Sequence, residues 1–202
     1  MAGAFNEDYT QYQTQRSGLR KLVRKAYLGS ARGQLQGAVL DFGCGVGELL
    51  ATLPAGSMGL EYNEATVAHC RGKGLDVAWY DGIRDDWSLS AVPRDRRFDS
   101  MIVSHVLEHL EAPATILRKL LLAAEGLGIR RVLVIVPGRA GFRIDATHVT
   151  FIDRAFLQDP AIVEGTAWKV ATARHFPLDI RAIGDWFPHH ELQVVFERMA
   201  AG

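Results

Sequence analysis

A short apolar stretch that leads directly into closely spaced glycines constrains the fold of this chain more than any other feature. Residues 38–42 have the sequence AVLDF and predict a buried β-strand, and residues 43–47 have the sequence GCGVG. Glycines at such a position allow a tight turn and let a ligand approach bare backbone. A turn of this kind follows the first strand of a nucleotide-binding sheet and begins a helix, which is predicted at residues 48–53.

The rest of the chain repeats the order of strand and helix. Strands are predicted at 58–62, 75–80, 98–104 and 131–136, and helices at 63–71 and 112–125. This alternation indicates βαβ units in a parallel sheet, with helices on both faces. Two more strands, at 170–176 and 192–198, have no long helix between them and would close the sheet as an antiparallel pair. The prediction is an α/β fold with a doubly wound, mostly parallel seven-stranded sheet and an antiparallel C-terminal strand pair.

The length of the chain fits one domain with an additional segment. At about 150 residues per domain, 202 residues exceed a single core only modestly. No linker or internal repeat divides them. We therefore expect a single domain over residues 1–202, with an amphipathic helical cap at 1–35, a cofactor-binding core at 36–138, and a substrate-side loop with the closing strands at 139–202.

Composition excludes several classes of protein. The 23 Lys and Arg residues balance 23 Asp and Glu residues, which argues against affinity for nucleic acid through phosphate neutralisation. Cys44 and Cys70 form neither a disulfide framework nor a metal-binding spacing. The N-terminus does not resemble a signal peptide, and no apolar run approaches the ~20 residues of a membrane helix. The expectation is a reduced, cytoplasmic protein with no membrane span and no nucleic-acid partner, whose oligomeric state the sequence leaves open.

Three acidic residues distinguish between the candidate cofactors. Glu48 occupies the place of the third glycine in the dinucleotide fingerprint GxGxxG, so the spacing here is GxGxG. Asp41 precedes the glycines, where a carboxylate would gain nothing from facing a pyrophosphate but suits a cofactor with a cationic amino-acid portion. Glu61 ends the second strand, where an acid can accept hydrogen bonds from ribose hydroxyls. These residues disfavour an NAD-linked oxidoreductase. The alternative is that residues 43–47 form an ordinary glycine-rich turn that binds no ligand.

With these residues, the sequence resembles the class I S-adenosylmethionine-dependent methyltransferases. VLDFGCGVG is similar to their first motif and GLEYN to their second, while FDSMIVSHVLEHLEAP is similar to the fourth-strand segment of members that act on small molecules. The resemblance covers roughly residues 36–138 and implies S-adenosyl-L-methionine as the cofactor. The cofactor-binding residues that it implies are Asp41, Gly43, Cys44, Gly45, Glu61, Tyr62, Asp81, Gly82, Ser104 and His105.

The resemblance also implies which part of the cofactor each of these residues would contact. The glycine turn would lie against the methionine portion, and Glu61 would hold the ribose. Tyr62 would pack on the adenine, and Asp81 would contact it, with Gly82 alongside. Ser104 or His105 would border the methionine end. The chain departs from the family pattern at Asn63, where Asp or Ser is commoner, and in the long polar insertion at 82–97. Both departures concern the adenine contacts.

A second motif points to different chemistry. His105, Glu108 and His109 match the HxxEH signature of inverted zinc peptidases, in which two histidines one helical turn apart share a metal and the glutamate acts as base. Here the motif directly follows a buried strand in a nucleotide-binding layout. The sequence therefore predicts no metal site.

Candidate substrate residues lie on both sides of the core. An oxygen or carbon acceptor needs a proton removed, and histidine is the obvious base near neutral pH. The catalytic candidates are His148, which follows the fifth strand, and His105. The alternative for His148 is a structural or substrate-orienting histidine. Tyr9 and Tyr12, at helical spacing, are candidate substrate-binding residues with His148, either on a lid or on a helix that packs against the sheet.

The sequence thus predicts S-adenosylmethionine-dependent methyl transfer to a small-molecule acceptor. Transfer from a sulfonium is an in-line displacement, in which the enzyme mainly aligns the acceptor with the methyl group. Oxygen is the favoured acceptor because His148 and His105 are available. The alternative is a non-catalytic S-adenosylmethionine-binding accessory or regulatory protein of the same fold.

Overall fold

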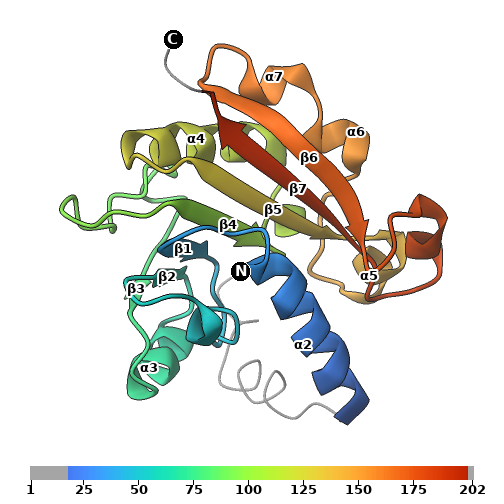
Figure 1. Ribbon diagram of the computed structural model, residues 1–202, viewed down its shortest axis with the longest axis horizontal. Coiled ribbons are helices and arrows are strands. Elements are labelled where there is room, and N and C mark those ends of the chain that lie inside the picture. The colour runs from blue at the N-terminus through green and yellow to red at the C-terminus, as the bar shows by residue number, and fades with distance from the viewer. Residues whose placement is uncertain (1–17, 200–202) are drawn as a thin grey trace.

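The computed structural model describes residues 18–199, and its centre is a seven-stranded sheet with the order β3-β2-β1-β4-β5-β7-β6 (Figure 1). Strands β1 to β5 are parallel, and β7 pairs antiparallel with both β5 and β6. The predicted fold class is confirmed. The strands are β1 (Val39–Phe42), β2 (Met58–Glu61), β3 (Val77–Trp79), β4 (Ser100–Ser104), β5 (Arg131–Pro137), β6 (Trp168–Phe176) and β7 (Glu191–Arg198).

Helices cover both faces of this sheet because its central strands are apolar on both sides. In β4, Met101 and Val103 belong to the core on the side of α4 (Pro113–Gly126), whereas Ile102 belongs to the core on the side of α2 (Gly18–Arg32). Successive side chains of a strand point to opposite faces, so each strand stabilises two cores.

The helix α3 (Glu64–Gly72) begins where the sequence predicts it. Asn63 is its N-cap, and the side-chain oxygen accepts a hydrogen bond from the backbone N–H of Thr66 at 3.0 Å. Such a cap satisfies an N–H that has no partner within the helix. None of the helices within 18–199 is both long enough and apolar enough to span a membrane.

The predicted helix at 48–53 is wrong. The structure has only η1 (Leu50–Thr52), a single 3-10 turn. Gly43, Gly45 and Gly47 all adopt positive φ, at +71°, +54° and +75°, so the chain is still turning where the helix was expected to begin. Leu53, which precedes Pro54, is extended at φ −79° and ψ 158°, because a residue before a proline disfavours helical geometry, and η1 therefore ends at Thr52.

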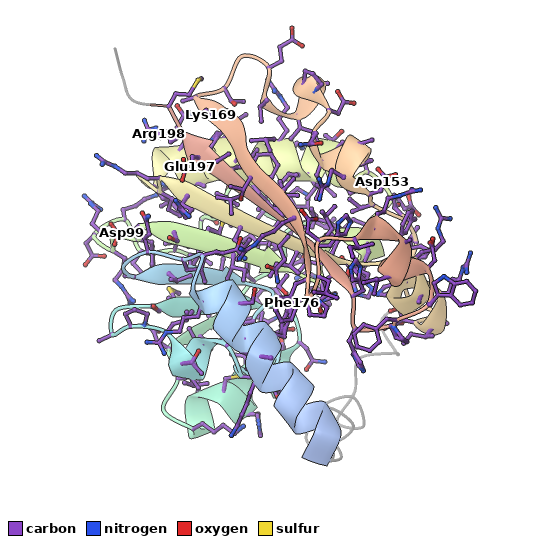
Figure 2. The ribbon with its side chains drawn as sticks, turned by 45° about the vertical axis from the view of Figure 1, so that its right-hand side comes forward. Asp99, Asp153, Lys169, Phe176, Glu197 and Arg198 are labelled. Atoms are coloured by element: carbon purple, nitrogen blue, oxygen red, sulfur yellow. The ribbon has the colours of Figure 1, made fainter. Side chains whose placement is uncertain are left out.

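The segments between β5 and β7 form short elements in addition to β6. These are α5 (Arg139–Ile144), α6 (Arg154–Leu157), α7 (Pro160–Val163) and η3 (Arg181–Asp185), while η2 (Leu107–His109) follows β4. Helix α5 contacts η3, and α7 contacts α4. Asp153 caps α6 by accepting a hydrogen bond from Phe156 N at 3.0 Å. Figure 2 shows Asp99, which precedes β4, at the left of the sheet and Asp153, which follows β5, at the right. The right-hand edge is therefore the carboxyl edge of the parallel strands.

Candidate active site

The glycine turn lies at the carboxyl edge between β1 and its neighbours β2 and β4, where the strand order reverses. Ligands of open α/β sheets bind at such a switch point. Gly43 N and Cys44 N both donate to the Leu60 carbonyl, at 2.8 and 3.1 Å, which fixes the turn onto β2. A Cβ on Gly43 would lie 2.5 Å from Val106 Cγ2. At Gly45, in contrast, no described atom lies within 4 Å of the corresponding position.

Glu61 connects the end of β2 to this turn, as the sequence predicts for residues of one site. Its carboxylate accepts hydrogen bonds from Gly45 N and from Asn63 N, both at 2.9 Å. Burial raises the pKa of Glu61, although these backbone hydrogen bonds oppose the shift. Asp41 is buried in β1, in register with Gly59 of β2 and Ile102 of β4.

The residues expected to contact adenine lie at the same edge, after β2 and β3. Tyr62 is 58 % exposed, and its carbonyl accepts a hydrogen bond from Trp79 Nε1 at 2.7 Å. Asp81 accepts hydrogen bonds from Ile83 N and Arg84 N, and so caps the turn that begins the 82–97 insertion. The position of a Cβ on Gly82 is filled by the ring of Trp87. After β2 the Tyr62 side chain is therefore exposed, and after β3 the Asp81 carboxylate is already engaged with backbone.

His105 is held between two carboxylates. Its Nδ1 lies 3.1 Å from Glu108 Oε1 and its Nε2 lies 3.0 Å from Glu191 Oε1. Burial alone would lower the pKa of His105, but Glu191 and Glu108 together raise it to about 10. The residue also adopts a positive φ of 54°, which a non-glycine residue keeps only where its surroundings enforce it. A protonated imidazole has no lone pair to take a proton, so this arrangement favours a charged anchor over a base.

Ser104, the residue before His105, is tied to the helix on one face of the sheet. Its hydroxyl lies 2.5 Å from Tyr27 Oη of α2. The ring centroid of Tyr27 lies 6.0 Å from that of His105. Helix α2 thus reaches the end of β4. Tyr9 and Tyr12, the other predicted substrate residues, lie outside the described residues.

His148 lies next to the same glutamate. Its Nδ1 is 2.9 Å from the Phe142 carbonyl oxygen, and its ring stacks on that of Phe142 at 5.2 Å. Its Nε2 lies 3.9 Å from both Glu108 Oε1 and Asp145 Oδ2. The structure therefore brings the two predicted catalytic histidines together around Glu108.

Sequence reasoning missed the acidic residues that organise these histidines. Glu108 was considered only within a peptidase motif, although its spacing of three residues from His105 indicates a contact. Glu191 gave no signal, because it reaches His105 from a strand 86 positions away.

A cavity of about 320 Å³ opens beyond β5 at the same edge of the sheet. Several basic side chains line it, together with Phe151, Ile152 and Leu192. The basic residues and histidines among its lining are Arg139, Arg154, Arg181, His175 and His190. This cavity is large enough for a small organic molecule.

Comparison with known proteins agrees with this architecture. The chain matches the model of the methionine biosynthesis protein MetW over residues 33–144. No curated protein matches it. A SAM-dependent methyltransferase from Archaeoglobus fulgidus superposes with a TM-score of 0.66 at 22% identity, over 96% of this chain and 100% of that one. Magnesium protoporphyrin IX methyltransferase from Synechocystis PCC 6803, solved with bound SAH, gives 0.60 at 18% identity, over 91% and 88% of the two chains. The class I methyltransferase fold is thereby confirmed.

Proposed function

The chain belongs to the MetW family of methionine biosynthesis proteins, and from this membership and its fold we propose that it binds S-adenosyl-L-methionine and transfers the methyl group to an oxygen of a small-molecule acceptor. One observation carries the proposal. The Glu61 carboxylate is hydrogen-bonded to Gly45 N, so the acid that would hold the ribose and the open glycine backbone form one site.

The residues around the glycine turn fit this cofactor. The position of a Cβ at Gly45 is open, whereas those at Gly43 and Gly47 are filled by Val106 and Leu75. A ligand can therefore reach backbone at one glycine while the other two hold the turn. Each Glu61 oxygen accepts one backbone hydrogen bond and keeps a lone pair that ribose hydroxyls can use. When bound, the cofactor supplies an electrophilic methyl group on a sulfonium.

The acceptor would enter from the segment after β5. In an in-line displacement, the oxygen–carbon bond forms as the carbon–sulfur bond breaks, and the sulfur keeps the electron pair. The acceptor proton must leave, and His148 Nε2 faces Glu108 and Asp145 in a position to take or direct it. His105, paired with Glu108 and Glu191, would be a positioning residue. Within a single domain, residues 36–138 would thus bind the cofactor and residues 139–202 the acceptor.

Calorimetric titration with S-adenosylmethionine, S-adenosylhomocysteine and NAD in parallel tests this proposal. We expect micromolar binding of the two sulfur compounds and no binding of NAD. Glu61→Gln should weaken S-adenosylhomocysteine binding by about tenfold or more, since a hydrogen bond from a ligand to a charged group contributes about 1.5–3 kcal/mol. Glu164→Gln, an exposed glutamate after α7, is the matched control. Failure of the wild-type chain to bind either sulfur compound would overturn the proposal.

A second candidate function is a non-catalytic S-adenosylmethionine-binding regulator of methionine biosynthesis. The observation that favours it is the engagement of both His105 nitrogens by carboxylates, which removes one of the two predicted bases. Turnover across a panel of hydroxylated small molecules separates the two functions. Cofactor binding without methyl transfer to any of them, in the presence of added divalent metal ions, would support the regulator.

A cytoplasmic location and a small-molecule partner are part of the same proposal. Both cysteines, Cys44 and Cys70, are free thiols in the structure, which is typical of a reducing compartment. The balanced charge of the chain does not suit a nucleic-acid substrate.

A further inference from the structure

Three side chains at the carboxyl edge of the sheet carry the donor atoms of a metal site. Glu108 and His109 belong to η2, and His148 belongs to the segment after α5; one donor atom from each lies within 4.8 Å of the other two. Donors around a tetrahedral ion at metal–ligand distances of about 2.1 Å are about 3.4 Å apart. Shifts of about 1 Å would therefore bring the three groups to ligating distance.

The hydrogen bonds of the two histidines leave the ligating nitrogens available. His148 Nδ1 lies 2.9 Å from the Phe142 carbonyl oxygen, and His109 Nδ1 lies 3.2 Å from the Thr147 carbonyl oxygen. Because a carbonyl oxygen only accepts, both Nδ1 atoms carry the proton and both Nε2 atoms keep a lone pair. A histidine that binds a metal usually donates its other ring nitrogen in this way, which fixes the tautomer and the ring orientation.

Glu108 Oε1 lies 3.9 Å from His148 Nε2, and the other oxygen of the Glu108 carboxylate is unsatisfied. The side chain is fully buried, and its Oε1 accepts the hydrogen bond from His105. Its Oε2 is also buried and has no hydrogen-bond partner among the described residues. An unsatisfied oxygen in the protein interior is costly, and coordination of the Glu108 carboxyl group to a cation would reduce that cost.

The backbone holds the two segments of this group together without any ligand. The Glu108 carbonyl accepts hydrogen bonds from Val149 N at 2.8 Å and from Thr150 N at 3.0 Å. The Thr150 hydroxyl donates to the Leu110 carbonyl at 2.7 Å. The segment that carries His148 is therefore fastened to the turn that carries Glu108 and His109.

Asp145 adds a fourth donor, a carboxylate oxygen, at the exposed side of the group. Its Oδ1 accepts hydrogen bonds from Thr147 N at 2.9 Å and from the Thr147 hydroxyl at 2.6 Å. Its Oδ2 lies 3.9 Å from His148 Nε2, and about half of the side chain is exposed. An ion can therefore enter at Asp145.

We infer that Glu108, His109 and His148, with Asp145 at the rim, bind a divalent transition-metal ion. Two imidazoles with carboxylates suit Zn²⁺, Fe²⁺ or Mn²⁺ better than Mg²⁺, which prefers oxygen ligands and water. The sequence predicts no metal, and the peptidase pairing of His105 with His109 is not formed, because both His105 nitrogens contact carboxylates. The site combines two of the three residues of that motif, Glu108 and His109, with His148.

The role that we assign to the metal ion rests on the proposed function, whereas the inference that these residues bind a metal ion does not. A metal ion at an acceptor hydroxyl lowers the pKa of that hydroxyl and holds the oxygen in place. The proton would leave to solvent past Asp145, and the oxygen would then attack the methyl carbon. Of the two roles proposed for His148, taking the acceptor proton or directing it, this arrangement favours the second, because His148 would hold the ion that directs the proton out.

The test is titration of the full-length, chelator-treated protein with Zn²⁺, Mn²⁺ and Mg²⁺ alone. We expect one Zn²⁺ per chain, weaker Mn²⁺ binding and no Mg²⁺ binding in the same concentration range. Co²⁺ should give the visible absorption of a protein-ligated ion. His109→Ala and His148→Ala should each weaken Zn²⁺ binding by about 100-fold or more, since even outer-shell changes at metal sites cost 10–100-fold.

The control is His189→Gln, an exposed histidine outside the group, which should bind Zn²⁺ as the wild-type chain does. His148 is more deeply buried than His109, so His148→Ala is the variant more prone to unfold. If it unfolds, His109→Ala still tests the site, because His109 is only half-buried. Absence of Zn²⁺ binding, or equal binding by His109→Ala and wild type, would overturn the inference. Titration of the same samples with S-adenosylhomocysteine tests the proposed function separately, because those residues lie outside the cofactor site.

Discussion

Alanine substitutions at Gly43 and Gly45 should separate the stability of the glycine turn from its ability to bind a ligand. Both glycines have positive φ, +71° and +54°, so an alanine at either position adopts a left-handed conformation. This conformation costs roughly 1–2 kcal/mol, less about 0.4–1 kcal/mol because alanine also restricts the unfolded chain. The surroundings of the two positions differ. Gly43→Ala would place a methyl group 2.5 Å from Val106 Cγ2, whereas Gly45→Ala would meet no described atom within 4 Å.

The expected magnitudes follow from this difference. Gly45→Ala should lower the free energy of unfolding by about 1 kcal/mol, which is about 2–4 °C in Tm for a chain of this length. Gly43→Ala adds an overpacking cost of about 1–3 kcal/mol, for a total of about 2–4 kcal/mol. For cofactor binding we expect Gly45→Ala to have the larger effect, because the alanine methyl group would occupy the open space at Gly45 that the cofactor needs.

The assays are thermal and urea unfolding, and calorimetric titration with S-adenosylhomocysteine. Gly45→Ala should retain most of its stability and lose binding by tenfold or more, whereas Gly43→Ala should mainly lose stability. Adding Val106→Ala to Gly43→Ala should restore part of that loss by removing the clash. The reasoning is refuted if Gly45→Ala binds with unchanged affinity, or if Gly43→Ala is no less stable than Gly45→Ala.

Two further predictions concern the framework of the site. Trp168→Phe removes a buried hydrogen bond of 2.9 Å from Trp168 Nε1 to the Leu121 carbonyl. The free energy of unfolding, measured in urea, should fall by about 1–3 kcal/mol. An unchanged urea midpoint would contradict this prediction. Asp85 accepts hydrogen bonds from Ser90 and Tyr80, which outweigh partial burial and lower its pKa from 3.8 to about 2. Because the folded pKa lies below the unfolded value, its contribution is present above pH 4 and is lost as the pH falls towards 2. Solvent screens this partly exposed carboxylate, which limits the contribution to about 1 kcal/mol. Asp85→Asn should therefore be less stable than wild type at pH 7 and converge with it near pH 2, and a constant difference across this range would count against the assignment.

Local patterns in the sequence were sufficient for the sheet and for the contact between Glu61 and the glycine turn. The cap at Asn63, the cap at Asp153 and the contact of Glu61 with the glycine turn each depend on residues close in sequence or on adjacent parallel strands. Such contacts follow from periodicity and from strand order, because the carboxyl ends of neighbouring parallel strands meet at one edge.

The contacts that sequence reasoning missed depend on tertiary structure. The helix expected after the glycine turn was lost to left-handed glycines at three alternate positions, 43, 45 and 47, whose φ values cannot be read from composition. The 82–97 insertion was expected to be polar, yet Leu89 and Val92 are buried in the core. The pairing of His105 with Glu191 requires the antiparallel return of β7, which places Glu191 opposite Pro137 at the end of β5.

The position of β7 between β5 and β6 has a consequence for synthesis on the ribosome. Within the described sheet, β6 pairs only with β7, so residues 168–176 have no neighbouring strand until residues 191–198 have emerged. Glu191, which neutralises one side of His105, arrives with the same strand. A nascent chain can therefore form the glycine turn and Glu61 early, while the histidine cluster stays incomplete until translation has passed β7. Premature termination before β7 would yield a chain that keeps the glycine turn and Glu61 but lacks the contact between Glu191 and His105.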